Sequence, residues 1–320
     1  MRLNVPTSMT ARVRDLLVDH PHITNVVLLE GASLDPVGDL FEFEVARETA
    51  SQLLRTLDDI GVGEQGGIVL STPTGTPFAA ARRLERLAPG DPQDAVVWDN
   101  VIADAYAASR PTVTYHLFLV LATILASVAV ITDSSVLVVG AMVVGPEFGT
   151  VAALCTGLVF ARWGLSWASL WLLVLGFAFA IAVVTVLAYG LVLVGAITDE
   201  MVTRPRPQTD FIWHPDGWSL VVALVAGAAG VLALSTDRVQ AMVGVFISVT
   251  TIPAAGNMAL GIATWETSEI IGSAVQLGVN VAGMVLAGIA VLALQRALWE
   301  RLMARTERLF RLGRQESQRR

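Results

Sequence analysis

The chain has 320 residues and a formal net charge of −7, and 54% of its residues are hydrophobic. An acidic chain without a basic, aromatic-lined surface is not expected to bind nucleic acid. Its hydrophobic residues are concentrated in residues 115–295, which are nearly free of charge, whereas residues 1–110 have the composition of a soluble domain. We therefore expect a soluble domain followed by a membrane domain. The single cysteine, Cys155, leaves no cysteine pattern for a metal site.

Residues 1–75 are expected to form an α+β domain. Its predicted elements are strands at 2–5, 23–31, 39–46 and 66–73 and helices at 7–20 and 49–62. This order, βαββαβ, is typical of a ferredoxin-like fold. No signal-peptide-like run begins the chain, so we place this domain in the cytoplasm. We expect it to regulate or oligomerise the membrane part, with His20 and His22 as surface histidines.

The membrane domain is expected at residues 113–296, after a linker and juxtamembrane helix at 76–112. A bilayer core about 30 Å thick requires about 20 apolar residues in a helix. Six segments are candidates: 115–131, 135–161, 166–196, 218–234, 239–263 and 270–295. Residues 297–320 form a basic tail, predicted to be either an amphipathic helix on anionic lipid or an extension of the sixth segment.

The second and fifth segments resemble each other. A shift of 104 residues superposes Thr132 on Thr236, Asp133 on Asp237 and Gly140 on Gly244. Each segment is a long uncharged run interrupted by proline. Because three segments per repeat is an odd number, the two repeats would enter the membrane from opposite sides. Such inverted repeats with broken helices are typical of secondary transporters.

The arginines predict the orientation of this domain. Arg110, Arg162, Arg238 and the arginine-rich tail would all lie on one side, which the positive-inside rule assigns to the cytoplasm. Both termini are therefore expected to be cytoplasmic, in a multi-pass protein of the bacterial inner (plasma) membrane.

The stretch "VVGAMVVGPEFGTVAAL" interrupts the second segment at Gly145, Pro146, Glu147, Phe148 and Gly149. Proline removes a backbone donor, and a broken helix in a bilayer is tolerated where protein or a water-filled cavity satisfies the freed groups. The half-helix ends can then bind a solute. A carboxylate at mid-membrane typically marks an ion or proton path, so Glu147 is the expected coupling residue. The alternative is a structural glutamate that holds the broken backbone.

The second break, "SVTTIPAAGN", contributes Ser248, Thr250, Thr251, Pro253 and Asn257. These side chains are expected either to line a solute site or to bond back to their own helix. In the last segment, Asn280, with Gln276 nearby, is expected to join this site or to bond between helices. Asp133 and Asp237, each in a Thr-Asp turn, are predicted helix N-caps with a gating role as the alternative.

Four stretches carry a family resemblance: "VGAMVVGPEFG", "TDFIWHPDGWSLVVALVAGAAGVLALS", "VGVFISVTTIPAAGNMA" and "QLGVNVAGMVLAG". They resemble the uncharacterised hydrophobic-domain family of bacteria and archaea, numbered 389 among domains of unknown function. In the N-terminal part, "LDPVGDLFEFEVARE" and "APGDPQDAVVWD" resemble its actinobacterial branch. Many relatives carry "SPLMGP" at residues 145–149, which implies that they keep the break without the glutamate. The resemblance itself implies no mechanism.

The expected function is secondary active transport of a small polar solute, such as the amino acids serine or alanine, by alternating access. The solute would bind between breaks at 145–149 and 250–257, with coupling to H⁺ through Glu147 or to Na⁺ bound by exposed carbonyls. The chain has no HExxH, G-x-S-x-G or P-loop motif, so we expect neither an enzyme nor an ATP-driven pump, and no cofactor. A homo-oligomer, dimer or trimer, is expected. The alternatives are a channel and a non-transporting membrane sensor whose N-terminal domain binds the ligand.

Overall fold

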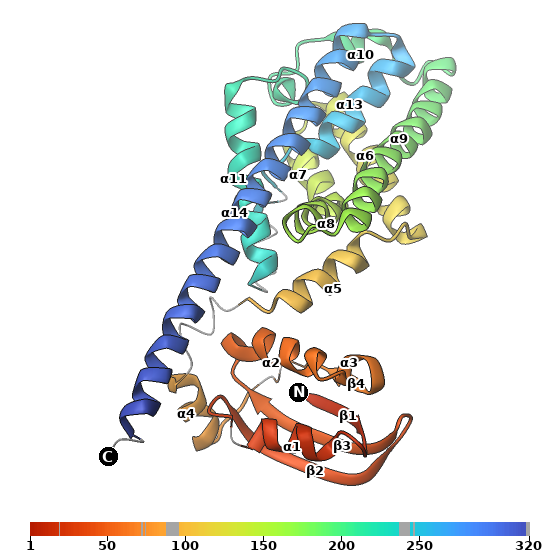
Figure 1. The fold of residues 1–320 in the computed structure, drawn as a ribbon. Coiled ribbons are helices and arrows are strands. Elements are labelled where there is room, and N and C mark those ends of the chain that lie inside the picture. Colours follow the sequence, from red (N-terminus) through yellow and green to blue (C-terminus); the bar gives the residue numbers. More distant parts are fainter. Residues whose placement is uncertain are drawn as a thin grey trace. The chain divides into compact units, whose positions relative to one another are not determined.

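The computed structural model describes residues 1–18, 20–71, 73, 75–87, 96–236, 244–245 and 247–317. The chain divides into two compact units, shown as a ribbon in Figure 1. One comprises Met1–Asp99 with Trp299–Arg320, and the other comprises Asn100–Leu298. Each unit has its own hydrophobic core.

The N-terminal unit contains a small antiparallel sheet with helices. Its elements are β1 (Arg2–Pro6), α1 (Thr10–Val18), β2 (Ile23–Leu34), β3 (Val37–Val45), α2 (Arg47–Asp59), α3 (Val62–Gln65), β4 (Gly67–Val69) and α4 (Ala79–Leu87). The strand order is β2-β3-β1-β4, so β1 lies between β3 and β4. A strand or helix therefore occupies each region for which the sequence predicted one, and α3 is an additional short helix.

The sheet packs one face against α1 and α2. Leu3 on β1 lies opposite Phe41 on β3, and Phe43 follows two residues later on the same face. All three are buried in one core with residues of both helices. This alternation follows from the two-residue period of a strand, as the sequence predicted. The prediction of surface histidines is wrong for His22, which is buried between α1 and the β2–β3 hairpin, where its carbonyl accepts from the Ala46 N–H at 3.2 Å.

The second unit is helical. Its elements are α5 (Trp98–Ala108), α6 (Val113–Thr132), α7 (Ser135–Val144), α8 (Glu147–Val159), α9 (Trp163–Leu193), α10 (Asp199–Thr203), η1 (Asp210–Ile212), α11 (Gly217–Ser235), α13 (Thr251–Thr264) and α14 (Thr267–Ser317). Because α14 continues to Ser317, the basic tail extends the sixth predicted segment as one helix.

Four described helices are long and apolar enough to cross a membrane: α6, α9, α11 and the Thr267–Trp299 part of α14. The pair α7 and α8 meets the same test together, with a bend of 52° at their junction, which would make a fifth span. The chain therefore has the helices of a membrane protein. The predicted segment 239–263 lies partly outside the described residues, and α13 is its described helix.

The helices of this unit recur along the chain. α6 begins at Val113 and α11 at Gly217, α8 at Glu147 and α13 at Thr251, and α9 at Trp163 and α14 at Thr267. The first residues of the two helices in each pair are 104 positions apart in the sequence. Glu147 and Thr251, which are hydrogen-bonded to each other, have this same offset. The predicted sequence repeat is therefore also a repeat of helix positions.

The turn after each broken helix repeats in detail. Ala161 and Trp265, which are equivalent by this shift, both have a positive φ, of 53° and 61°. The next residue in each turn donates its backbone N–H to the carbonyl oxygen of a glycine in the preceding helix. Arg162 donates to Gly157 at 2.7 Å, and Glu266 donates to Gly261 at 2.9 Å. Two sequences with little identity thus form the same turn.

Each broken helix packs against helices of the other repeat. The carbonyl oxygens of α13 accept hydrogen bonds from Ser127 of α6 and Thr185 of α9. Correspondingly, α8 lies against α11, where a Cβ at Gly230 would collide with the Phe148 ring, and against α14, where Cys155 meets Gly288. This reciprocal packing brings the starts of α8 and α13 together in the interior.

Candidate functional site

The two helix breaks end earlier in the chain than the sequence suggested. α7 ends before Gly145, Pro146 is the N-cap residue of α8, and helix resumes at Glu147. Likewise α13 resumes at Thr251, so the predicted breaks at 145–149 and 250–257 are corrected to breaks that end at residues 146 and 250. The reason is that proline is tolerated in the first turn of a helix, where its missing N–H has no helical partner, and Pro253 is the third residue of α13.

The starts of α8 and α13 are joined by a buried hydrogen bond. The Thr251 hydroxyl donates to Glu147 Oε1 at 2.7 Å. Glu147 is 7% exposed and Thr251 is fully buried. Gly145 permits this approach, because a Cβ there would collide with the Glu147 carboxylate and with Ile252. The carboxylate also lies at the N-terminus of its own helix, where the helix dipole stabilises negative charge.

A stripe of polar side chains on α14 faces α13 and its N-cap residue Thr250. Its members are Glu269, Ser273, Gln276 and Asn280. Their spacing of four, three and four residues places them on one face of the helix. All four are at most 3% exposed, and they lie in the Thr267–Trp299 part of α14, which is apolar enough to cross a membrane. Burial of polar groups is costly unless they are hydrogen-bonded, so their partners define the candidate site.

The first group of partners, here called the break cluster, comprises Glu147, Thr250, Thr251, Gln276 and Asn280. Gln276 and Asn280 both donate to the Thr250 hydroxyl, at 2.9 and 2.7 Å. Two oxygen atoms of the cluster, Glu147 Oε2 and Gln276 Oε1, are buried without a hydrogen-bond partner among the described residues. The cluster therefore presents unused acceptors beside two helix N-termini.

The second group, here called the Arg206 cluster, comprises Arg206, Asn257, Glu269 and Ser273. Arg206 donates to Glu269 Oε1 at 2.6 Å and to Asn257 Oδ1 at 2.9 Å. Asn257 in turn donates to Glu269 Oε2 at 2.7 Å and to Ser273 at 2.8 Å. Three parts of the fold thereby share one buried ionic network, because Arg206 belongs to the connection between α10 and η1 and the other residues belong to α13 and α14.

Sequence reasoning missed Arg206, Glu269 and Ser273. The four-three-four spacing of polar residues in the last segment could have revealed the α14 stripe. Arg206, in contrast, stands in a connection rich in charged residues, and only the folded chain shows that it is buried while Arg204 beside it is exposed.

The other predicted site residues lie elsewhere. The Phe148 side chain is buried against Gly230 and contributes to packing between α8 and α11. Gly149 lies beside Ala108 of α5. Ser248 is exposed and donates to the Val245 carbonyl at 2.7 Å, within its own segment. The structure thus brings together Glu147, Thr250, Thr251 and Asn280, and places Asn257 in the neighbouring Arg206 cluster.

Asp133 is not the helix N-cap that the sequence predicted. It is the C-cap residue of α6, with a φ of 48°, and Ser134 caps α7 by accepting from Leu137. The left-handed conformation is favourable for aspartate because its short side chain tolerates it. The Asp133 carboxylate accepts from Gln208 N–H at 3.1 Å and from the Thr209 hydroxyl at 2.9 Å. Its predicted counterpart Asp237 lies outside the described residues.

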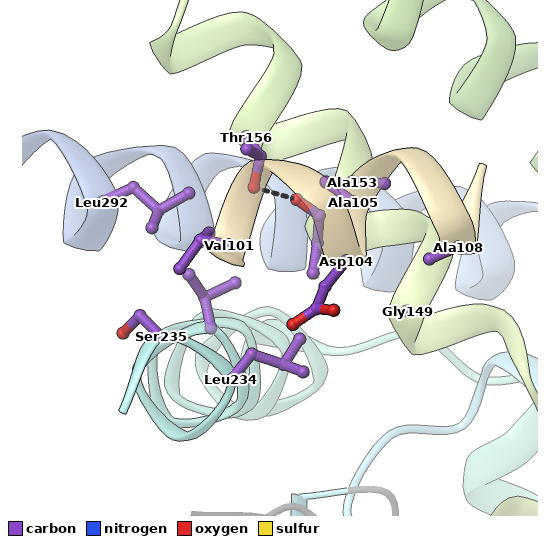
Figure 2. Close-up of a pocket in the computed structure, with 12 residues that line it drawn as sticks. Val101, Asp104, Ala105, Ala108, Gly149, Ala153, Thr156, Leu234, Ser235 and Leu292 are labelled. Carbon is purple, nitrogen blue, oxygen red and sulfur yellow. Dashed lines mark hydrogen bonds between the residues drawn. The ribbon is translucent and has the colours of Figure 1, made fainter. Parts of the chain in front are cut away.

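A separate cavity of about 60 Å³ lies between α5, α8, α11 and α14. Most of its lining is apolar, including Val101, Leu234 and Leu292, and Gly149 and Thr156 of α8 form one wall. Figure 2 shows Asp104 of α5 pointing toward Leu234 of α11. The cavity reaches α8 at Gly149, two residues after Glu147, and no residue of the break cluster lines it.

The donors and acceptors of the break cluster suit a ligand better than a tightly bound metal. In the described residues no three histidine, cysteine or carboxylate side chains gather as a metal site would require. The helix dipoles at the starts of α8 and α13 favour an anionic group. The unused carboxylate and amide oxygens favour a cationic or hydroxyl-bearing group. This combination can hold a small zwitterion.

Comparisons with known proteins find a match to a family domain of unknown function and one to an uncharacterised protein. An uncharacterised protein of Methanocaldococcus jannaschii is 23% identical over 192 residues, which cover 60% of this chain and 56% of that protein. The matched region therefore spans little more than half the length of this relative. No solved structure matches the chain. The model of the domain of unknown function DUF389 matches residues 142–286, which contain both breaks and the whole α14 stripe.

Proposed function

We propose that the protein is a secondary active transporter of a small polar solute, with an amino acid such as serine or alanine as the first candidate. The observation that carries this proposal is the meeting of two helix starts with a buried polar stripe in an apolar helical unit. Polar and ionisable groups inside membrane spans are costly and typically serve a solute or ion path.

The break cluster offers each part of an amino acid a partner. The solute carboxylate would lie at the N-termini of α8 and α13, where backbone N–H groups and helix dipoles favour negative charge. Its ammonium group would bind Glu147 Oε2 and Gln276 Oε1, which have no partner among the described residues. A hydroxyl side chain would find Thr250 and Asn280 nearby. We propose this arrangement as the solute site.

The repeat supports alternating access. We propose six spans in two inverted three-helix repeats, with the partly described segment 239–263 as the fifth span and both termini in the cytoplasm of a bacterial cell. In such transporters the two repeats rock around a site at mid-membrane. The βαββαβ order and the strand order β2-β3-β1-β4 support a ferredoxin-like N-terminal domain, to which we assign a regulatory or oligomerising role. We propose assembly as a homodimer or homotrimer, testable by light scattering.

Coupling to H⁺ through Glu147 is our first proposal, and coupling to Na⁺ is the second. Glu147 can accept a proton because it is buried and only one of its carboxylate oxygens has a partner among the described residues. Glu147→Gln keeps the size of the side chain and removes its charge. If pH-driven uptake persists in this variant, Glu147 is not the coupling residue.

The test of transport begins with a thermal-shift screen of amino acids on the purified full-length protein. Solutes that raise Tm are then offered as radiolabelled substrates to proteoliposomes with imposed pH or Na⁺ gradients. Saturable uptake above the external concentration is expected, whereas flux that only equilibrates would indicate a channel. Thr251→Val, which removes the bond to Glu147, should reduce uptake at least tenfold, and Ser248→Ala should leave it unchanged. Equal uptake by both variants would place the site elsewhere.

A further inference from the structure

Arg206 is unusual for its place in the chain. It belongs to the connection between α10 and η1, whose neighbouring residues Arg204, Pro205 and Pro207 are exposed. Arg206 itself is 3% exposed. Arginine is almost never fully buried unless it is paired, and here the guanidinium is paired with Glu269 at 2.6 Å. The connection therefore inserts one charged side chain into the helical unit.

The residues 199–212, here called the cover segment, also adhere to the rest of the unit by other contacts. Val202 and Ile212 are buried in one core with Ala254 and Leu260 of α13. On its exposed side, Arg204 donates to the Ile131 carbonyl at 2.6 Å. The segment thus closes over α13 and the beginning of α14, with Arg206 as its innermost charged residue.

The first repeat has a counterpart of this segment, but without charge at the buried contact. α5 precedes the first repeat as the cover segment precedes the second, and its Ala105 packs in a cluster with Ala153 and Leu165. The residues 104 positions after Ala153 and Leu165 are Asn257 and Glu269. The same two places are therefore apolar in one repeat and polar in the other, so simple packing does not require the charged network.

The network makes removal of the cover segment electrostatically costly. Separating a buried ion pair leaves an uncompensated charge in a medium of low dielectric constant. Glu269 would then need another positive charge, because a buried carboxylate without a counter-charge is neutralised by binding a proton or a cation. Two side-chain oxygens, of the Glu269 carboxylate and the Asn257 amide, already accept from the guanidinium, and the Ser273 hydroxyl accepts from the Asn257 amino group beside them. Oxygen is the donor that hard cations prefer.

We propose that Glu269 and Asn257, with Ser273 beside Asn257, form a monovalent-cation site whose Glu269 and Asn257 oxygens Arg206 occupies in this conformation, and that the cover segment leaves when H⁺ or Na⁺ replaces the guanidinium. The inference builds on the proposed transport cycle, in which departure of the cover segment opens one side of the unit. It adds a second charged site to Glu147, which belongs to the break cluster.

The charged groups around Glu269 allow this exchange to be isolated. Helix α13, which contacts Glu269, has no ionisable side chain. Glu266, just before α14, is half-buried. In the cover segment, every charged residue apart from Arg206 is exposed: Asp199, Glu200, Arg204 and Asp210. Beyond the segment, His214 pairs with Asp210 at 3.1 Å on the surface. Arg206 is therefore the counter-charge that the experiment must remove.

The test compares the Tm of purified full-length variants in NaCl and in choline chloride at equal ionic strength, from pH 5.5 to pH 8.5. Arg206→Gln should lower Tm by about 5–10 °C at pH 8.5 in choline chloride, because Glu269 loses its counter-charge. Recovery on addition of Na⁺ would identify sodium, and recovery only at pH 5.5 would identify the proton. The Tm of the double variant Arg206→Gln/Glu269→Gln should respond neither to Na⁺ nor to low pH. The control Arg204→Gln, two residues away, should have the Tm of the unmodified protein under each condition.

The proposal is overturned if Arg206→Gln responds to neither Na⁺ nor pH, or if its response persists in the double variant. Because Arg206→Gln could fail to fold, a second measurement keeps Arg206 and Glu269 in place. Val202→Cys and Thr203→Cys, each with Cys155→Ala, report a fully buried and an exposed position of the cover segment. The maleimide labelling rate of the Val202→Cys variant, relative to that of the Thr203→Cys variant, should rise several-fold with Na⁺ or at low pH. An unchanged ratio would refute the exchange.

Neither measurement involves uptake. Cation-dependent Tm and labelling without any uptake would leave the cation site standing and remove the proposed transport. If the protein takes up solute but its Arg206→Gln variant is insensitive to cations, the proposed transport would stand and the cation site would be refuted.

Discussion

Asn257 uses both ends of its side-chain amide. Its carbonyl oxygen accepts from Arg206, and its amino group donates to Glu269 and Ser273. Each of these partners is buried, so the side chain is fixed in one orientation by the requirement that donors meet acceptors. The residue therefore holds the connection, α13 and α14 in one relative position.

Asn257→Ala should lower the free energy of unfolding by about 3 kcal/mol, because it leaves buried partner groups unsatisfied. Ser248→Ala is the matched control. Ser248 is exposed and bonds within its own turn, so its change should stay within about 0.5 kcal/mol. Unfolding of the purified protein in detergent, followed by circular dichroism, measures both. Equal losses would show that the network around Asn257 contributes little.

The two N-terminal histidines predict a dependence on pH. Burial lowers the pKa of His22 below its usual 6.5, and burial together with the charge of His22 lowers the pKa of His20. Their contribution to stability is therefore fully present above pH 6.5 and is lost as pH falls below that value. Hydrogen exchange of α1 and β2 peptides, corrected for intrinsic rates, should be faster at pH 5.5 than at pH 7.5. His20→Gln/His22→Gln should reduce the difference, and an unchanged difference would assign it to other groups.

Part of the candidate site could be predicted at this scale. Thr250, Thr251, Asn257 and Asn280 were identifiable because polar side chains are conspicuous in uncharged segments. The division of these residues between the break cluster and the Arg206 cluster could not be predicted, because it depends on where a connection far away in the sequence inserts Arg206. A single sequence shows that arginine is present and gives no indication that it is buried.

The broken helices show how proline and glycine act differently. Proline marks a helix start in both repeats, at the N-cap of α8 and in the first turn of α13, as its missing N–H requires. Glycine instead permits close approach between helices. A Cβ at Gly256 of α13 would collide with Ala126 and with the Ser127 backbone of α6. The existence of both breaks was predictable from proline, whereas the residue at which each break ends was not, because proline does not show on which side the helix resumes.

Gly227 gives an element-scale prediction. A Cβ at this position of α11 would lie 2.5 Å from the Met284 Cα of α14, which is backbone that cannot rotate away. Gly227→Ala should therefore destabilise the helical unit by about 1–3 kcal/mol. Gly278→Ala on α14 is the control, because its Cβ would meet nothing within 4 Å and alanine favours helix by about 1 kcal/mol. In thermal unfolding, the Tm of Gly227→Ala should be lower than that of the unmodified protein, and the Tm of Gly278→Ala should be equal to it or higher.

The whole molecule joins a small antiparallel sheet unit with a helical unit built from a repeat. The strand pattern and the long apolar helices followed directly from periodicity, because burial of one strand face or of a whole helix fixes residue type locally. The repeat was detectable in a few residues of sequence, and the structure extends it to helix starts, turns and interhelical contacts. Arrangement across the membrane stays a prediction, because it depends on lipid and on charge at the two surfaces.

That arrangement predicts opposite exposure of two cysteines. With Cys155→Ala as background, Glu200→Cys on α10 should react with a membrane-impermeant maleimide in intact cells. Arg110→Cys, between α5 and α6, should react only after the membrane is opened. Both side chains are exposed, so access alone decides the outcome. Labelling of both from the same side would exclude inverted repeats.

The bond between Glu147 and Thr251 joins a position to its own counterpart in the other repeat. In an object with two-fold symmetry, a position can meet its counterpart only on the symmetry axis. Two identical glutamates there would face each other as like charges, whereas a glutamate and a threonine form a hydrogen bond. Only one of the two equivalent positions can therefore carry the acid. Because Glu147 lies on the pseudo-symmetry axis, its location identifies the point about which the two halves of the helical unit would have to move.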